Sequence, residues 1–138
     1  MSVHRFAVRV YYEDTDLAGI VYYANYLKFI ERGRSEWLRE LGIDQARLKA
    51  DRGIVFAVRR VEADYLRPAH FDDLLVVETA PEAVSGARVV LRQRVMRDGA
   101  MIFAAGVTVV ALGAGGGPVR LPADIRRLLA GEAGENRP

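Results

Sequence analysis

The sequence contains no cysteine and only two histidines, and it has no apolar run near the roughly 18 residues that a membrane span requires. The absence of cysteine excludes disulfides and thiolate metal sites, and it agrees with a reducing compartment. His4 and His70 are far apart in the sequence and belong to no ligand-spaced cluster. The first nine residues lack the apolar segment of a signal peptide. We therefore expect a cytoplasmic protein without a membrane span, metal or cofactor.

Several well-defined motifs are also missing. No serine lies in a G-x-S-x-G elbow, so a Ser-His-Asp hydrolase has no support. The glycine run at 113–117 precedes Pro118 and lacks the Lys-Ser/Thr pair of a phosphate-binding loop. No zinc finger, basic-region helix or stacked-aromatic RNA motif is present, which argues against a nucleic-acid partner. The net charge of +2 suits an anionic ligand, but an arginine-rich composition gives the same value.

The length and composition fit one folded domain. The chain has 138 residues, of which 51% are hydrophobic, and this is enough for a substantial core. We assign residues 1–130 to this domain. Residues 131–138 are short, polar and poor in apolar side chains, so a disordered tail is predicted there.

Hydrophobic periodicity predicts one long helix and five strands. The helix is expected at 22–41, with Tyr26, Ile30, Gly33 and Trp37 on one face and Gly42 as its end. Gly33 inside a helix favours close approach of a neighbouring chain segment. Strands are expected at 6–12, 54–66, 74–79, 88–97 and 101–112, followed by a loop at 113–118 and a short helix at 121–130.

The order of these elements predicts an α+β fold in which a five-stranded antiparallel sheet wraps around one long helix. Asp98-Gly99 between the last two long strands is typical of a type I′ hairpin turn. One helix covers only one face of the sheet, although strands such as 74–77 and 107–112 are apolar on both sides. The sheet also has unpaired edge strands, and pairing of two copies through one of these edges would cover it.

The segment at 14–26 is the best candidate for a chemical site. Two carboxylates, Asp14 and Asp16, lie in a glycine-containing loop that leads into the predicted helix. The first N–H groups of a helix lack internal partners and can polarise a carbonyl oxygen. A carboxylate just upstream could attack that carbonyl or deprotonate a water molecule. On spacing alone, the alternative is that both aspartates only cap the helix and order the turn.

This segment and several others resemble a known family. The sequence is similar to the 4-hydroxybenzoyl-CoA thioesterase-like hot-dog proteins, and within them to the Tol-Pal-associated acyl-CoA thioesterases. The likeness covers roughly residues 5 to 128. It is carried by 8–16 (VRVYYEDTD), 19–26 (GIVYYANY), 29–31 (FIE), 34–36 (RSE), 58–60 (VRR), Tyr65, 67–69 (RPA), 72–74 (DDL) and 121–122 (LP).

The resemblance implies a hot-dog fold, a homodimer or homotetramer, and hydrolysis of acyl-CoA without metal or cofactor. The sequence leaves open whether CoA or acyl carrier protein carries the acyl group. It places the catalytic carboxylate on Asp16 and the N–H that polarises the thioester on Tyr23. Substrate-binding positions fall on Gly19, Val21 and Tyr22 in the same turn. Basic residues near the CoA phosphates are expected, and Arg88 is the best candidate, with Arg59 and Arg60 as weaker ones. The alternative is that Arg88 is only a solvated strand residue.

Two questions stay open from the sequence. Asp16 can act as a nucleophile that forms a mixed anhydride, or as a general base for water. The Tol-Pal branch often has histidine where this chain has Tyr23, which leaves the acyl preference undetermined. Two rival functions are a hot-dog dehydratase or hydratase, which usually needs a histidine at the start of the helix, and a non-catalytic acyl-carrier or envelope-complex partner.

Overall fold

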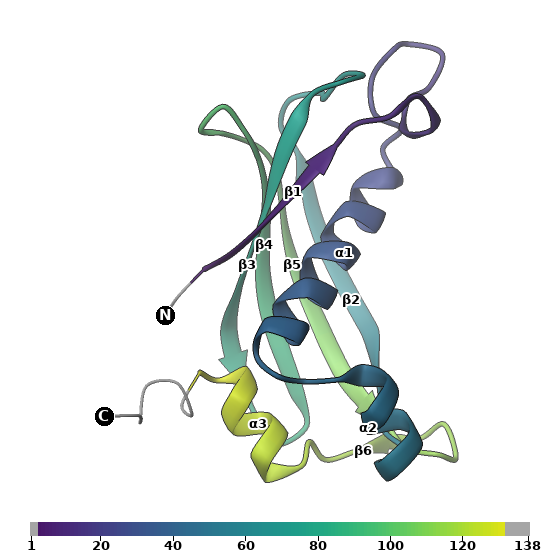
Figure 1. The fold of residues 1–138 in the computed structure, drawn as a ribbon, viewed down its shortest axis with the longest axis vertical. Helices are drawn as coiled ribbons and strands as arrows, with labels where there is room; N and C mark the ends of the chain where they lie inside the picture. The colour runs from purple at the N-terminus through teal and green to yellow at the C-terminus, as the bar shows by residue number, and fades with distance from the viewer. Residues whose placement is uncertain (1–2, 132–138) are drawn as a thin grey trace.

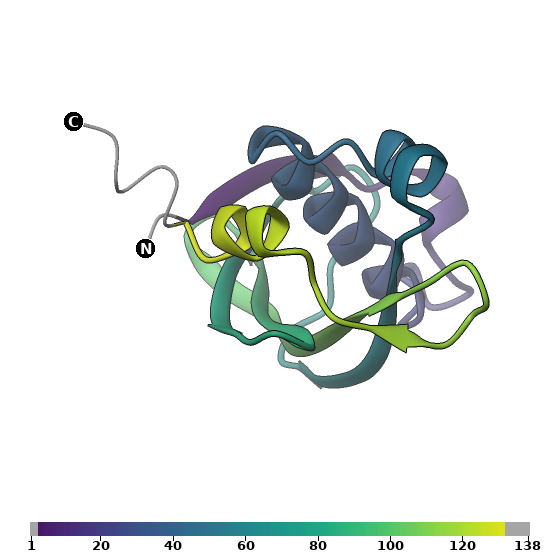
Figure 2. The same cartoon turned by 90° about the horizontal axis from the view of Figure 1, so that it is seen from below.

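In the computed structural model of the chain, which describes residues 3–131, one long helix lies against an antiparallel sheet (Figure 1). Seen from below, the sheet curves around the helix (Figure 2). The strand order is β1-β3-β4-β5-β2, and the short β6 pairs with β5. The strands are β1 (His4–Arg9), β2 (Val55–Tyr65), β3 (Leu74–Val84), β4 (Arg88–Arg97), β5 (Ala100–Leu112) and β6 (Pro118–Val119). The helices are the 3-10 helix η1 (Tyr12–Asp14), α1 (Asn25–Glu40), α2 (Gln45–Arg52) and α3 (Ala123–Leu129).

This arrangement confirms the predicted α+β class and the sheet wrapped around one long helix, with β6 as a sixth strand of two residues. The predicted tail lies outside the described residues except for Gly131. Within the described part of the chain, no helix is both long and apolar enough to cross a membrane.

Helix α1 packs on the sheet through the face that the sequence predicts. Tyr26, Ile30 and Trp37 are 3%, 1% and 5% exposed, and Phe29 joins them. Gly33 on the same face is required by a close contact, because a Cβ there would lie 2.5 Å from Val77 Cγ1 of β3. The close approach that Gly33 permits is therefore made by a side chain of the sheet and not, as predicted, by another backbone.

Strands β2, β4 and β5 follow the predicted ranges closely, whereas β1 ends earlier and β3 later than predicted. Asp98 and Gly99 have φ angles of 51° and 79°, as the predicted type I′ turn requires. Strand β3 continues to Val84, beyond its predicted end at residue 79, because a register shift between Pro81 and Ala83 preserves its pairing with β4. Such a bulge accommodates an extra residue without ending the ladder.

Helix α2 is absent from the sequence prediction. Its N-cap residue Asp44 accepts a hydrogen bond from Arg47 N–H at 3.1 Å, and Gly53 ends it with φ 64°. These are a standard helix start and a standard helix stop. Only Leu48 of this helix is buried, so the segment lacks the apolar periodicity on which the prediction relied.

Strand β2 leaves an open sheet edge. It is 11 residues long, lies last in the strand order, and exposes Val58, Val61 and Tyr65 at 45%, 38% and 47%. An unpaired apolar edge of this length favours association with another strand. We predict a stable homodimer or homotetramer with no populated folded monomer at micromolar concentration. Sedimentation or light scattering tests this, and a folded species of 15.3 kDa would contradict it.

Candidate active site

The loop between β1 and α1 is folded back on itself by its own backbone. Thr15 and Val21 form an isolated antiparallel bridge, which closes a small hairpin around Asp16. Asp16 N–H donates to Ile20 O, and Gly19 N–H donates to Asp16 O, both at 2.9 Å. Gly19 has φ 80°, a conformation that glycine adopts without strain. The tip of this hairpin is therefore a rigid turn that presents Asp16.

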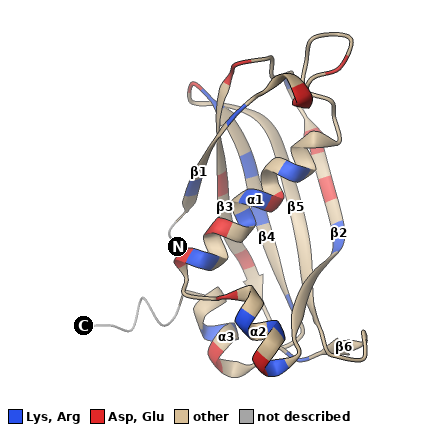
Figure 3. Cartoon of the chain, turned by 45° about the vertical axis from the view of Figure 1, so that its right-hand side comes forward, with Lys and Arg blue, Asp and Glu red and all other residues tan. Residues whose placement is uncertain are grey.

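The Asp16 carboxylate is exposed and only partly used by the protein. Its Oδ1 accepts a hydrogen bond from Ala18 N–H at 2.9 Å, which orients the side chain. Within residues 3–131 its Oδ2 has no hydrogen-bond partner and no basic group forms an ion pair with it. Figure 3 shows acidic segments at this loop end of the molecule. One carboxylate oxygen is thus oriented and available to an incoming ligand.

Asp14 has a structural role. It is 8% exposed, and its Oδ2 accepts from Tyr11 N–H at 2.8 Å. Its backbone oxygen accepts from Tyr22 N–H and from Asn25 Nδ2, both at 2.9 Å. Helix α1 has no side-chain cap, so the alternative that Asp14 and Asp16 cap this helix is wrong, but both carboxylates do order the turn, through Tyr11 N–H and Ala18 N–H. The two carboxylates each accept one hydrogen bond from a backbone N–H, and they differ in that Asp14 is buried while Asp16 is exposed.

Helix α1 starts later than the sequence predicts, at Asn25 instead of Tyr22. The bonds from Tyr22 N–H and Asn25 Nδ2 to Asp14 hold this segment in a turn, and Asn25 N–H closes it on Tyr22 O at 2.8 Å. Tyr23 and the N-cap residue Ala24 thus precede the first helical residue. Among the described residues, no acceptor takes a hydrogen bond from Tyr23 N–H or from Ala24 N–H.

Predicted strand residues 10–12 belong to this same loop, because β1 ends at Arg9. Val10 still exchanges hydrogen bonds of 2.9 Å with the Asp72–Asp73 turn, but Tyr12 begins the 3-10 helix η1. The bond from Tyr11 N–H to the Asp14 carboxylate competes with continued strand pairing here.

A cluster of aromatic side chains contacts the turn at 22–25. Tyr65, the last residue of β2, donates its hydroxyl to Tyr23 O at 3.0 Å, and its ring meets Phe103 edge-on with centroids 5.1 Å apart. Tyr26 stacks on Phe103 with centroids at 5.0 Å and accepts a hydrogen bond from Ala69 N–H at 3.1 Å. Burial raises the pKa of Tyr65 and of Tyr26, so both hydroxyls stay protonated. The sequence analysis assigned no role to Tyr65, although the residue belongs to the quoted family motifs.

The turn at 68–73 holds the other side of the loop. Val21 N–H donates to Ala69 O at 2.8 Å, and Ile20 bridges to His70. Arg97 fixes this turn through Pro68 O at 2.8 Å and Asp73 Oδ2 at 2.9 Å. Burial alone would raise the pKa of Asp73, but hydrogen bonds from His70 N–H and Arg97 hold it below its usual value.

The predicted substrate-binding residues of the turn lie together but differ in exposure. Gly19 and Tyr22 are exposed beside Asp16 and Tyr23, and Tyr22 is 47% exposed. Val21 is 3% exposed and belongs to the core, so its side chain faces away from a ligand in this loop. The structure therefore places Asp16, Gly19, Tyr22 and Tyr23 as exposed residues of one loop between β1 and α1.

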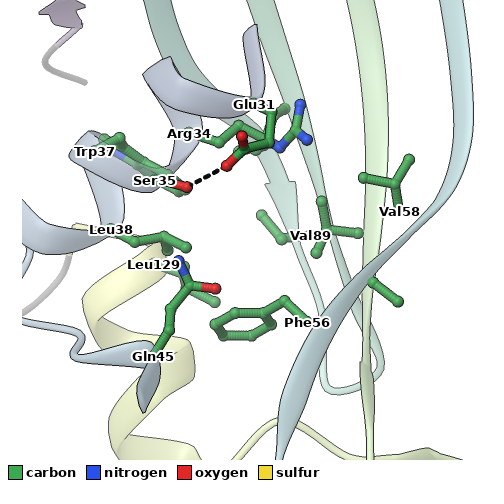
Figure 4. A pocket seen from close by; sticks show the side chains of 13 residues that line it. Glu31, Arg34, Ser35, Trp37, Leu38, Gln45, Phe56, Val58, Val89 and Leu129 are labelled. Atoms are coloured by element: carbon green, nitrogen blue, oxygen red, sulfur yellow. Dashed lines mark hydrogen bonds between the residues drawn. The ribbon is translucent and has the colours of Figure 1, made fainter. Parts of the chain in front are cut away.

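A separate cavity of about 250 Å³ lies between α1 and the strands β2, β4 and β5 (Figure 4). Its walls include Leu38, Phe56 and Val89, and Arg34 extends from the helix toward the strands. Arg34 Nη1 donates to the fully buried Gln93 at 3.0 Å. Burial lowers the pKa of Arg34, an effect that the charge of Glu31 opposes. Asp16 and Tyr23 do not line this cavity.

The predicted phosphate-binding arginines lie far from Asp16 in the same chain. Arg88 starts β4, and Arg97 beside the loop ends it, so the strand separates Arg88 from the loop by about 30 Å. Arg59 lies at the register shift of β2 between Val58 and Arg60. Across the sheet it is close to the residues of β5 and β2 that align with Arg88. Arg60 is engaged with Glu62 at 3.1 Å. Arg59 and Arg88 are both exposed, but Arg88 lies at the opposite end of β4, whereas Arg59 lies near the middle of β2.

Comparison with known proteins defines the class. The family model for the thioesterase superfamily matches residues 18–104, and the chain belongs to this superfamily. The acyl-CoA thioesterase YbgC of Haemophilus influenzae is 43% identical over 122 residues, which are 88% of this chain and 90% of the relative. The acyl-CoA thioester hydrolase YbgC of Escherichia coli is 42% identical over 95 residues, 69% of this chain and 70% of the relative.

Comparison with solved structures agrees with this assignment to the thioesterase superfamily. A probable thioesterase from Bartonella henselae has a TM-score of 0.84 at 39% identity, covering 88% of this chain and 100% of that chain. A variant of 4-hydroxybenzoyl-CoA thioesterase complexed with 4-hydroxybenzoyl-CoA has a TM-score of 0.86 at 24% identity, covering 92% and 98%, and supports the fold alone. The hot-dog fold predicted from the sequence is confirmed.

Proposed function

We propose that the protein hydrolyses acyl-CoA thioesters to free carboxylic acid and CoA, with Asp16 as its catalytic carboxylate. The observation that carries this proposal is that one loop holds an oriented carboxylate oxygen of Asp16 and, in the next turn, the N–H groups of Tyr23 and Ala24, which have no partner among the described residues. The acyl-CoA thioesterase relatives at 42–43% identity support the same reaction.

In the proposed mechanism, the thioester carbonyl oxygen accepts a hydrogen bond from Tyr23 N–H. The carbonyl carbon then becomes more electrophilic, and negative charge that develops on its oxygen is stabilised. In one route, an Asp16 oxygen attacks this carbon, CoA leaves as thiolate, and water cleaves the resulting mixed anhydride. In the other, Asp16 removes a proton from a water molecule that attacks the carbon directly. Both routes yield one acid and one CoA for each water consumed.

A thiol-release assay on a panel of acyl-CoAs tests the proposed reaction and ranks its substrates. The panel should include short, medium and long alkyl chains and aromatic acyl groups. Turnover of at least one class is expected. Tight binding of acyl-CoA without thiol release by any member would support the rival function of a non-catalytic acyl-carrier or envelope-complex partner.

For the nucleotide end of CoA, we propose that Arg88, with help from Arg59, binds its phosphates across a subunit boundary. Within one chain the length of β4 separates Arg88 from the catalytic turn by about 30 Å, whereas Arg59 is six residues, or about 20 Å, from Tyr65 beside that turn. Antiparallel pairing of two copies through the β2 edge would bring the Arg88 end of one sheet toward the Asp16 end of the other. Such a dimer would have two active sites. Each site would take its carboxylate from one copy and its arginines from the other.

Arg88→Ala should raise KM for acyl-CoA more than it lowers kcat, because phosphate binding is nearly equal in the ground state and the transition state. A truncated thioester without the nucleotide should be hydrolysed at the wild-type rate by this variant. Steady-state kinetics on both substrates measure the difference, and equal effects on both would reject a phosphate role.

Co-expressed subunits provide a control for the cross-subunit arrangement. A heterodimer of Asp16→Asn and Arg88→Ala chains, isolated through two different tags, contains one intact site if Arg88 acts on the other copy. It contains none if both groups act within one chain. Recovery of wild-type KM in the heterodimer supports the arrangement, whereas retention of the raised KM contradicts it.

The cytoplasmic location, the place in the Tol-Pal branch and the use of acyl carrier protein as an alternative acyl donor stay predictions from the sequence. A thiol-release assay with acylated carrier protein in place of acyl-CoA tests the last of these.

A further inference from the structure

Two consecutive peptide groups before α1 share an unusual arrangement of hydrogen bonds. The carbonyl of the Tyr22–Tyr23 peptide accepts from Asn25 N–H at 2.8 Å, and the carbonyl of the Tyr23–Ala24 peptide accepts from the Tyr65 hydroxyl at 3.0 Å. The N–H groups of these two peptides, those of Tyr23 and Ala24, donate to nothing within residues 3–131. Each of these two peptide groups is thus held through its carbonyl oxygen, while its N–H has no acceptor among the described residues.

The hydrogen bond from Tyr65 has two effects on the Ala24 donor. A trans peptide is planar, with its C=O and N–H pointing in opposite directions, so fixing the carbonyl also fixes the direction of the N–H. Donation to the carbonyl also polarises the amide and strengthens its N–H as a donor. Tyr65 therefore acts through the Tyr23–Ala24 peptide, on the side opposite to an incoming ligand.

The position of Tyr65 is itself well determined. It ends β2, pairs with Phe103 of β5, and its ring makes edge contacts with Tyr23 and Tyr26 at centroid distances of 6.1 and 5.5 Å. A hydroxyl held by three aromatic neighbours loses little freedom when it forms the bond to Tyr23 O.

We propose that Tyr65 is a positioning residue of the oxyanion site, and that the Ala24 N–H which it orients is a second donor to the thioester oxygen beside Tyr23 N–H. This inference rests on the proposed thioesterase function. Two donors on one oxygen match the two lone pairs that become more basic as the carbonyl carbon becomes tetrahedral. The contribution of Tyr65 is therefore larger in the transition state than in the bound substrate.

Tyr65→Phe should lower kcat about 10-fold with KM nearly unchanged, which is less than the about 100-fold cost of deleting an oxyanion donor. Tyr12→Phe is the matched control, since it also removes one tyrosine hydroxyl near the loop, but a hydroxyl with no hydrogen bond among the described residues. The control should keep wild-type kcat. A Tyr65→Phe variant with wild-type kcat, or with a change in KM alone, would overturn the proposal.

A double-mutant cycle separates positioning from general packing. Ala24 has φ −70°, which proline can adopt, so Ala24→Pro removes the N–H that Tyr65 is proposed to orient. In that background Tyr65→Phe should cause no further loss, whereas independent effects would multiply and contradict the proposal. If circular dichroism shows that Ala24→Pro is misfolded, replacement of the amide at Ala24 by an ester removes the same N–H without the ring.

The outcome also distinguishes this inference from the proposed function. A wild-type protein that hydrolyses no acyl-CoA refutes the function itself. An active wild-type protein whose Tyr65→Phe variant is equally active refutes the role of Tyr65 alone.

Discussion

Asp16→Asn is expected to lower kcat by about 100-fold or more while the protein keeps its fold, because a carboxylate that acts as nucleophile or general base has a contribution of at least this size. Asparagine retains an oxygen that can accept the hydrogen bond from Ala18 N–H, so the turn should keep its geometry. Acyl-CoA binding should change little for the same reason. Steady-state kinetics together with calorimetric binding of acyl-CoA measure the two quantities separately.

Asp14→Asn is the matched control for this prediction. Its carboxylate is buried and accepts from Tyr11 N–H, and an amide oxygen can take over that bond. We expect a far smaller loss of kcat than at Asp16, with a lower melting temperature because a charge-assisted hydrogen bond is lost. Wild-type activity of Asp16→Asn, or equal losses at both positions, would refute the assignment of Asp16.

Tyr23→Pro is expected to fold and to be nearly inactive. Among residues 3–131 no acceptor takes a hydrogen bond from the N–H of Tyr23, so its removal leaves none of these acceptors without a donor. Proline with φ near −65° is tolerated next to the start of a helix. Loss of one oxyanion donor typically lowers kcat by about 100-fold or more. The comparison is kcat/KM against the wild type, with circular dichroism to establish that the variant is folded.

Two side-chain variants serve as controls for Tyr23→Pro. Tyr23→Phe removes only the hydroxyl and should lose less than about 10-fold, because the proposed donor is a backbone group. Tyr23→His should stay active and acquire a pH dependence near the value of about 6.5 for free histidine. If Tyr23→Phe is as inactive as Asp16→Asn, the hydroxyl takes part in chemistry. If a folded Tyr23→Pro is fully active, the oxyanion site lies elsewhere.

Elements with strong periodicity or turn chemistry were predictable from the sequence. The buried face of α1, the paired strands β4 and β5 and the turn at Asp98-Gly99 each depend on short-range patterns that tertiary contacts reinforce. Helix α2 was missed because only Leu48 of it is buried, although Asp44 and Gly53 carried recognisable start and stop signals.

The details of the catalytic turn depend on contacts between residues distant in sequence. The start of α1 is delayed by hydrogen bonds to Asp14, and the support from Tyr65 comes from the far end of another strand. No local propensity encodes either contact. The different environments of Asp14 and Asp16 likewise follow from tertiary burial, since the two residues are chemically identical in the sequence.

The most direct test of the central claim is a stoichiometric assay of the purified wild-type protein with acyl-CoA, in which released thiol and free acid are both quantified. Asp16→Asn is assayed in parallel at the same concentration of folded protein. The account predicts repeated turnover with one acid for each CoA in the wild type, and a rate at least about 100-fold lower in the variant. Binding of acyl-CoA without release of thiol, or equal rates for the two proteins, would contradict it.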